Sequence, residues 1–417
     1  MAAVILALAI SRAVDRISPV LDGWGRRIME RKIAVKKRNW LTWIAMGLML
    51  VSLTACSVPR IRAEDRLFLP VTVDFLDHYS LAQQPFGDTT LGGLSALAYD
   101  RQRDRFYALS DDRGQYGRSR FYQLAIGWRL QQDGQPGFDT VTLESVTALR
   151  NQEGNPFSPG YLDPEGMALA PNNRLWISSE GDDRQNAPPL IGEFDRTTGQ
   201  LQRTLTIPSR FLAGRSAAGE VGIRNNLGFE ALTITADSGL AAAREPFRLF
   251  TVSESALAQD YDNDPSRPLY SRFLHYLVSP EQTTLIAEQA YPLDLEPSGA
   301  IVNGVTALLA IDPGGHFLAL ERAYGLRGFG VKLYQWATGG ATDTSSLPSL
   351  APPGQDLRPI AKQLVVDFKD APCPVDNLEG MALGPRLPDG SQSLILITDN
   401  NFQPEVKSQL ILLRLRM

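Results

Sequence analysis

The stretch Asp376-Asn377-Leu378-Glu379-Gly380-Met381-Ala382-Leu383 recurs in altered form four times upstream. Its nearest copy is Asp163–Leu169, and a looser one is Gly228–Ile234. Two more, Leu94–Tyr99 and Val305–Ala310, keep the apolar frame but lose the acid. Self-similarity at a roughly fixed period indicates a repeat architecture. The position of the acid, here called the key position, is held at similar intervals along the chain by Ser95, Glu165, Glu230, Thr306 and Glu379.

An apolar run that ends on an acid follows each copy. These runs are short, rich in aliphatic and aromatic residues, and bounded by Gly, Asp and Asn, which predicts strands joined by turns. Each repeat therefore begins as a hairpin, with a polar group near the start of one strand and an acid at the end of the next. Five such hairpins around an axis would gather those side chains in one place. The runs are Phe106–Asp111, Leu175–Glu180, Leu249–Glu254, Phe317–Glu321 and Leu394–Asp399.

The strand pattern predicts an all-β protein, a β-propeller of five four-stranded blades. Four repeats show a third and a fourth strand, whereas the last repeat ends after its third, Gln409–Leu415. An N-terminal strand, Leu67–Phe75, has no partner of its own and supplies the missing strand. Pairing of this strand with the last blade would close the ring and leave no long exposed edge. A sixth, divergent blade is the alternative, although no unassigned stretch is large enough for one.

Residues 1–55 have the order of a secretory signal. A basic segment that contains Lys36-Lys37-Arg38 precedes an apolar segment, Trp40–Leu53, and we expect Met29 to be the true start. The closing Leu53-Thr54-Ala55-Cys56 resembles the lipobox of bacterial lipoproteins. That resemblance implies cleavage before Cys56, lipid attachment to its sulfur, and a protein anchored to a membrane of the bacterial cell envelope, facing the periplasm or exterior. A plain transmembrane anchor is the alternative, but its apolar segment is short for a span of about 20 residues. Residues 56–66 would then be a lipidated tether and residues 67–417 the propeller.

The charge balance argues against a nucleic-acid partner. Residues 1–55 hold nine Lys and Arg and three Asp and Glu, which leaves 32 basic against 43 acidic residues, or −11, for the rest. Nucleic-acid binding needs a basic surface. An acidic body suits a cation site, although acidity also serves solubility. We expect a monomer that acts on a small anionic or ester substrate.

The motifs together resemble the phytase-like family, the "esterase-like activity of phytase" domain of bacterial secreted and lipid-anchored proteins. The resemblance covers roughly Leu91–Leu415 and implies a β-propeller with an esterase-like or phosphatase-like activity. A fold does not fix a function, so that label stays loose. The residues that carry the resemblance are Gly92–Leu97, Phe106–Arg113, Asp163–Ala168, Asn226–Leu232, Asp376–Ala382 and Thr398–Asn400.

Carboxylates are the expected chemistry of the site. If the first two strands of each blade face the axis, Glu165, Glu230 and Glu379 project there as metal ligands and catalytic candidates. Clustered carboxylates raise one another's pKa values unless a cation compensates, and Ca²⁺ prefers oxygen ligands. The alternative is structural, with each glutamate tying adjacent blades through backbone N–H groups. A second acidic ring is expected from Asp111, Glu180, Glu254, Glu321 and Asp399. Two of these acids, Asp111 and Asp399, are further catalytic candidates. The guanidinium groups of Arg113, Arg224 and Arg322 could bind an anionic substrate or compensate the charge of the acids.

The leading functional hypothesis is an envelope-anchored, Ca²⁺-dependent hydrolase of a phosphate or carboxylate ester, with an acidic residue of the second ring as general base. The alternatives are a non-catalytic propeller that binds a ligand or a protein, and a lactonase-type propeller. A Ser-His-Asp triad is not expected, because none of the three histidines, His78, His275 and His316, lies in a repeat motif.

Overall fold

The computed structural model describes residues 67–417, apart from residues 183–184, 218, 236–244, 263, 265–266, 295–299, 327 and 351–356. The expected signal region, the tether and Cys56 lie outside the described residues.

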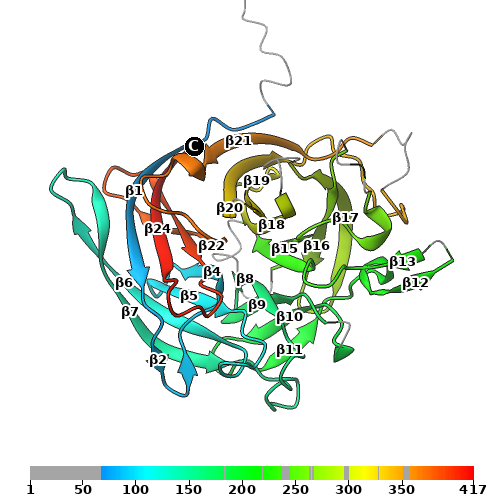
Figure 1. Cartoon of the computed structure of the whole chain (residues 1–417), viewed down its shortest axis with the longest axis horizontal. Coiled ribbons are helices and arrows are strands. Elements are labelled where there is room, and N and C mark those ends of the chain that lie inside the picture. Colours follow the sequence, from blue (N-terminus) through cyan, green and yellow to red (C-terminus); the bar gives the residue numbers. More distant parts are fainter. Residues whose placement is uncertain are drawn as a thin grey trace, which may run out of the picture. The chain divides into compact units, whose positions relative to one another are not determined.

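Five antiparallel sheets of four strands each are arranged in a ring (Figure 1). The innermost strands β4, β8, β14, β18 and β22 contact one another in turn around the axis of the ring. This arrangement confirms the predicted five-bladed propeller. The first blade consists of β4 (Leu94–Asp100), β5 (Arg105–Ser110), β6 (Arg120–Leu130) and β7 (Pro136–Ala148), and the second of β8 (Pro164–Ala170), β9 (Arg174–Ser179), β10 (Leu190–Asp195) and β11 (Leu201–Thr204). The third blade consists of β14 (Phe229–Ile234), β15 (Phe247–Ser253), β16 (Tyr270–Val278) and β17 (Thr283–Pro292). The fourth consists of β18 (Ala300–Ala310), β19 (His316–Gly325), β20 (Gly328–Ala337) and β21 (Ala361–Asp367).

The fifth blade closes the ring with the two ends of the described chain. It consists of β22 (Leu378–Arg386), β23 (Gln392–Thr398), β24 (Ser408–Arg416) and β1 (Thr72–Leu81). Strand β1 pairs antiparallel with β24, from Thr72 opposite Arg416 to Leu81 opposite Ser408. The predicted closure is therefore confirmed, but the strand starts at Thr72 rather than at Leu67. Pro70 has no N–H group to donate to a ladder, so the residues around it do not pair.

The hydrophobic core lies between the blades. Each pair of neighbouring blades shares one cluster of buried residues; Tyr107 and Leu109 of the first blade, for example, pack with Met167 and Ile177 of the second. Because the apolar side chains are used between the sheets, polar residues can occupy the strand ends nearest the axis. Two short hairpins, β2–β3 (Pro85–Phe86, Thr89–Thr90) and β12–β13 (Gly214–Ser216, Gly219–Val221), and the 3₁₀ helices η4 (Ser209–Phe211), η6 (Ala258–Asp260) and η7 (Phe368–Asp370) decorate the blades. Within the described ranges, no helix has the length and hydropathy that crossing a membrane requires.

Candidate functional site

Strand register places two polar groups of each repeat at the same end of the ring. In four blades the first strand begins one residue before the key position, and this first residue pairs with a Ser or Thr that ends the second strand. These pairs are Leu94 with Ser110, Pro164 with Ser179, Phe229 with Ser253 and Leu378 with Thr398. The acid after each Ser or Thr therefore emerges beside the key position. We call this the ring position, and its acids are Asp111, Glu180, Glu254 and Asp399.

The fourth blade breaks this pattern. Here Val305, the residue before Thr306, pairs with Glu321. Glu321 thus corresponds to the Ser and Thr of the other blades, and Arg322 occupies the ring position. The Glu321 carboxylate pairs instead with Lys362 at 2.5 Å and accepts a hydrogen bond from Tyr291 Oη. The second ring consequently holds four acids and one arginine rather than the five acids expected.

A cavity of about 890 Å³ opens at this end of the ring. Two of the three predicted arginines, Arg113 and Arg322, line it. Arg224 does not line it: its guanidinium donates to Ala256 O at 2.9 Å and to Ser255 Oγ at 3.1 Å. Six carboxylates from key and ring positions line the cavity, namely Asp111, Glu165, Glu230, Glu254, Glu379 and Asp399.

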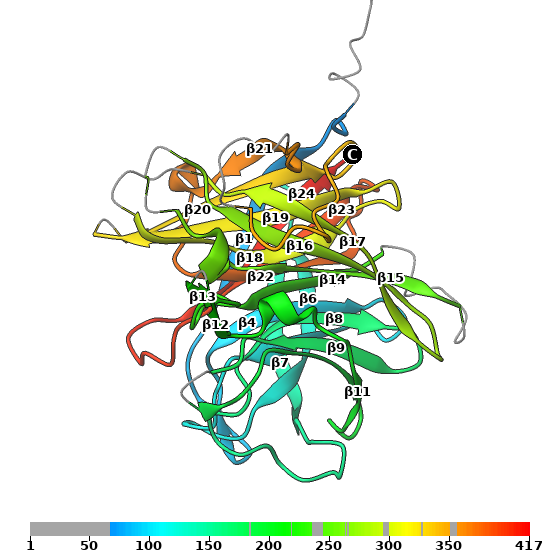
Figure 2. The same cartoon turned by 90° about the vertical axis from the view of Figure 1, so that its right-hand side faces the viewer.

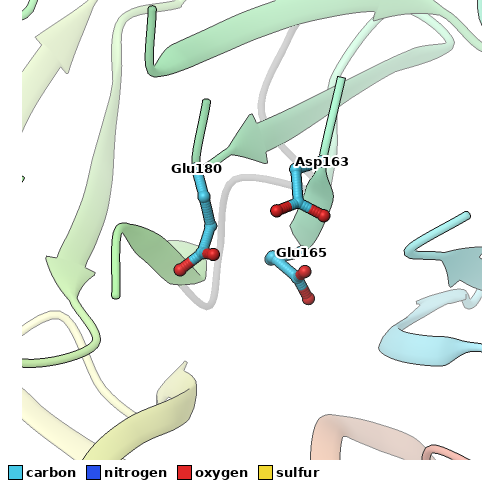
Figure 3. A group of neighbouring side chains, drawn as sticks. All are labelled: Asp163, Glu165 and Glu180. Carbon is cyan, nitrogen blue, oxygen red and sulfur yellow. The ribbon is translucent and has the colours of Figure 1, made fainter. Parts of the chain in front are cut away.

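Two overlapping groups of carboxylates lie beside the cavity. Asp163 and Glu165, at the start of β8, face Glu180 after β9 (Figure 3). One oxygen from each of these three residues lies within 4.8 Å of the others. Glu180, Glu230 and Glu254 form a second group with the same spacing. Acids of the second and third blades therefore form one continuous cluster.

The two key positions without an acid tie blades together. Ser95 Oγ donates to Pro164 O at 3.2 Å, and Thr306 Oγ1 donates to Leu378 O at 3.0 Å. Each acceptor belongs to the next blade around the ring. These hydroxyls thus fill a structural role at the key position. Glu230 and Glu379 differ, because both lie against Arg322.

Arg322 is the main internal counterion of the cluster. Its Nη2 lies 3.0 Å from Glu254 Oε1 and 3.6 Å from Glu230 Oε1, and its Nη1 pairs with Glu379. Burial alone would lower its pKa, but the three glutamates outweigh burial and hold the pKa of Arg322 above its ordinary value. The guanidinium therefore stays charged, and its attraction is shared among three acids.

Arg113 is paired with groups of the second blade and of the segment that leads into the third. Its Nε donates to Asp163 Oδ1 at 2.7 Å, and its Nη2 donates to Asn226 Oδ1. Both arginines at the cavity are thus already paired with groups of the protein itself.

Burial and mutual repulsion make these carboxyl groups hard to ionise. Desolvation, reinforced by neighbouring acids, raises the pKa of Glu165, Glu180 and Asp111 well above its usual range. Desolvation also raises the pKa of Glu379 to about 8 and that of Asp399 to about 6, even though Arg322 lowers both. Without a bound metal ion, the groups with the most strongly raised pKa values, such as Glu379, therefore keep their protons at neutral pH.

The donor set fits calcium. Six carboxylates from key and ring positions line the cavity, Asp112 and Asp376 line it as well, and Asp163 and Glu180 lie beside it. Among the described residues, the guanidinium groups that line this cavity are those of Arg113 and Arg322. Glu254 is 1% exposed, and its Oε2 has no hydrogen-bond partner; Asp111 Oδ1 likewise has none. Unpaired buried carboxylate oxygens are costly and normally indicate a missing partner. Ca²⁺ takes six to eight oxygen ligands in irregular geometry, as this cluster offers.

Asp163 and Asn377 are among the polar residues of the site that were not predicted from the sequence. They lie two residues before Glu165 and Glu379, directly ahead of strands β8 and β22. Asn377 Nδ2 donates to Glu379 Oε1 at 2.8 Å and to Asp399 Oδ2 at 3.3 Å. Their spacing of two from the key position was the available signal.

Comparison with known proteins agrees with the geometry. Residues 89–402 match the family described as phytase-like, with the "esterase-like activity of phytase". The chain belongs to the phytase-like family. No curated protein matches this phytase-like chain.

Solved structures resemble the phytase-like chain only distantly. An endo-arabinase from Bacteroides thetaiotaomicron is 9% identical, with a TM-score of 0.39 over 80% of this chain and 98% of that one. The catalytic domain of a Coprinopsis cinerea GH62 α-L-arabinofuranosidase is 13% identical, with a TM-score of 0.38 over 82% and 97%. The Kuenenia stuttgartiensis hydrazine synthase is 10% identical, with a TM-score of 0.32 over 79% of this chain and 65% of that one.

Proposed function

We propose that the protein is a calcium-dependent hydrolase of a phosphate or carboxylate ester, with its active site in the cavity at the acidic end of the propeller. The observation that carries the proposal is the excess of carboxylates over guanidinium groups around an open cavity. Membership of the phytase-like family supports it.

Calcium would be held by the continuous acidic cluster of the second and third blades. Asp163, Glu165 and Glu180 offer one set of ligand oxygens, and Glu230 and Glu254 extend it. When bound, the ion would offset the repulsion among the acids and polarise an ester oxygen of the substrate.

Asp399 is the best candidate for a general base. It lines the cavity, and its pKa of about 6 leaves it ionised at neutral pH yet basic enough to accept a proton from water. The backbone N–H of Asn401 donates to Asp399 Oδ1 at 2.9 Å, and Asn377 Nδ2 holds its other oxygen. These bonds orient the carboxylate in the cavity wall.

Calorimetry and a hydrolysis assay with p-nitrophenyl acetate and p-nitrophenyl phosphate test the proposal. Calcium at about 100 times its Kd should raise the melting temperature by roughly 3–6 °C, and a chelator should abolish hydrolysis. Glu230→Gln and Glu254→Gln keep the side-chain volume but remove a charge, so both should reduce the calcium response. Glu144→Gln is the matched control, because Glu144 pairs with Arg105 away from the cavity.

The competing functions give different results. Calcium binding without hydrolysis of either ester would favour a non-catalytic binding propeller. If neither p-nitrophenyl ester is hydrolysed but a lactone assayed alongside them is, a lactonase-type propeller would be favoured. Melting that ignores calcium would contradict the metal site itself.

We also propose that Cys56 anchors the protein to a membrane of the bacterial cell envelope. The support is the lipobox-like segment Leu53–Cys56 after an apolar stretch. Cys56→Ala should leave the precursor unprocessed or release the protein from the membrane fraction. Unchanged size and unchanged membrane retention would contradict the anchor.

A further inference from the structure

One blade extends past the acidic end of the ring. In the fourth blade β18 begins at Ala300, well before Thr306, and β19 continues beyond Arg322 to Gly325. At about 3.3 Å per residue the extension amounts to roughly 10–20 Å. Figure 2 shows the yellow end of this blade projecting on the same side of the molecule as the red loop that follows β23.

The extension forms an apolar wall of the cavity. Val302 pairs with Tyr324 across β18 and β19, and Tyr324 pairs with Phe329 across β19 and β20. All three side chains line the cavity, and the two rings lie 4.9 Å apart. Tyr324 is 48% exposed, and Leu326 at the tip is 93% exposed. Exposing this much apolar surface beside a cavity has a hydrophobic cost that a bound apolar group would offset.

A second aromatic wall comes from the first and fifth blades. Tyr116 stacks on Phe402 with ring centroids 4.2 Å apart and an interplanar angle of 9°. Both line the cavity; Phe402 is buried beneath Tyr116, which is 47% exposed. Phe402 adopts φ 52°, a left-handed conformation that costs a bulky residue about 1–2 kcal/mol. Such strain is typical of functional loops.

The cavity offers little to a polyanion. Arg113 and Arg322 are paired with Asp163 and with three glutamates, and no lysine is among the described residues that line the cavity. A multiply phosphorylated substrate would meet the eight carboxylates that line the cavity, and the described lining residues include no unpaired cationic side chain to bind it. An uncharged aromatic ester meets no such repulsion.

We propose that the walls formed by Val302, Tyr324 and Phe329 and by Tyr116 and Phe402 bind the aromatic group of an aryl carboxylate ester, whose ester bond lies over the acidic floor. That the bound ester is hydrolysed rests on the proposed function. That an aryl group binds rests on the two aromatic walls alone. Of the phosphate and carboxylate esters in the proposed function, this binding makes aryl carboxylate esters the substrate class.

The kinetic arm compares 1-naphthyl acetate, ethyl acetate and inositol hexakisphosphate in the presence of calcium. After division by the rate of the uncatalysed hydrolysis of each ester, which corrects for the better leaving group of the aryl ester, 1-naphthyl acetate should still have the higher kcat/KM of the two acetates. Tyr324→Ala and Tyr116→Ala should each raise KM for 1-naphthyl acetate roughly two- to tenfold with little change in kcat, because ring stacking contributes that much to binding. Tyr161→Ala is the control, since Tyr161 is 41% exposed but does not line the cavity. Equal kcat/KM for the two acetates after this division, or faster turnover of the polyphosphate, would overturn the proposal.

The binding arm needs no turnover. Saturable binding of 1-naphthol, followed by its fluorescence, should weaken by the same factor in Tyr324→Ala and Tyr116→Ala but not in Tyr161→Ala. Circular dichroism and melting temperature check that each variant is folded. Wild-type binding of 1-naphthol with no hydrolysis of any ester would sink the proposed function and leave the aryl subsite standing. Unchanged 1-naphthol binding in both folded variants would overturn the subsite even if hydrolysis is observed.

Discussion

The guanidinium of Arg322 lies 3.0 Å from the carboxylate of Glu254, and the two residues hold the same ring position in neighbouring blades. Four blades supply an acid there and one supplies an arginine. The protein therefore carries its own counterion at the centre of the site, and a bound metal must compete with it for Glu230, Glu254 and Glu379.

Replacing Arg322 should separate stability from calcium affinity. Arg322→Gln leaves three buried glutamates without their counterion, so the metal-free protein should lose about 3–5 kcal/mol of unfolding free energy. Removing one positive charge from the site should also tighten calcium binding by about tenfold or more. Isothermal titration and calorimetry with calcium or chelator measure both effects, and Arg322→Lys, which keeps the charge, is the control. Weaker calcium binding in Arg322→Gln would show that the arginine supports the metal site instead of competing with it.

The repeat of the key position was enough to predict the propeller, but it could not fix the register of the fourth blade. The interval from Glu165 to Glu180 is one position shorter than that from Ser95 to Asp111. Either Glu321 or Arg322 could therefore follow Thr306 at an acceptable spacing. In the other blades a strand end marks the ring position. In the fourth blade β19 continues to Gly325, and no turn residue marks the place.

The parts of the site that depend on long-range packing also could not be predicted from the sequence. Nothing near Phe402 in the chain indicates that Tyr116, which follows the second strand of the first blade, stacks on it. Residues 302, 324 and 329 belong to three strands, and only their cross-strand register brings them into one row. By contrast, Glu165, Glu230 and Glu379 share one phase in the repeat, and this phase correctly indicated that they face one cavity.

The hydroxyls at two key positions should matter for stability only. Ser95→Ala and Thr306→Val each remove one hydrogen bond to the next blade, which should cost about 1 kcal/mol. Since the two residues lie in different blades and share no partner, the losses should add in the double variant. Denaturant unfolding measures the losses. The calcium-induced rise in melting temperature should stay at its wild-type value, and its loss in either variant would place these hydroxyls in the metal site.

Closure of the ring should depend on β1. Deleting Thr72–Leu81 exposes the backbone donors and acceptors of β24 and removes apolar contacts to Leu413 and Leu415, so we expect an insoluble or strongly destabilised protein. Phe75→Ala is a graded version and should cost about 1–3 kcal/mol, because Phe75 is only half buried. Ser80→Ala, an exposed position on the same strand, is the control. Wild-type melting of the deletion variant would contradict closure.

Stability of the metal-free protein should fall as the pH rises. Burial raises the pKa of Asp163 and Asp399 to about 6 and that of Glu379 to about 8, against about 4 for such carboxyls in an unfolded chain. Between these values the folded state binds more protons than the unfolded state, so unfolding free energy is highest near pH 4 and declines toward pH 8. Asp294 affects stability in the opposite direction. Although burial opposes the shift, bonds from Tyr334 and Lys332 lower its pKa to about 2, so its ionised form stabilises the fold and this stabilisation is lost only below about pH 4.

Calcium should reverse this pH dependence, because it binds the ionised carboxylates and displaces their protons. Calcium affinity should therefore rise from pH 5 to pH 8, and titrations at pH 7 in buffers of different ionisation enthalpy should report proton release. Glu379→Gln should flatten the stability profile of the metal-free protein between about pH 6 and pH 8, since each unit of pKa shift corresponds to about 1.4 kcal/mol. Glu144→Gln should keep the wild-type profile between pH 6 and pH 8. The bond from Arg105 lowers the pKa of Glu144, so this carboxyl group does not change its protonation in that range. A metal-free stability that is constant or rising over this range would mean that the acidic cluster is already ionised and compensated without a metal.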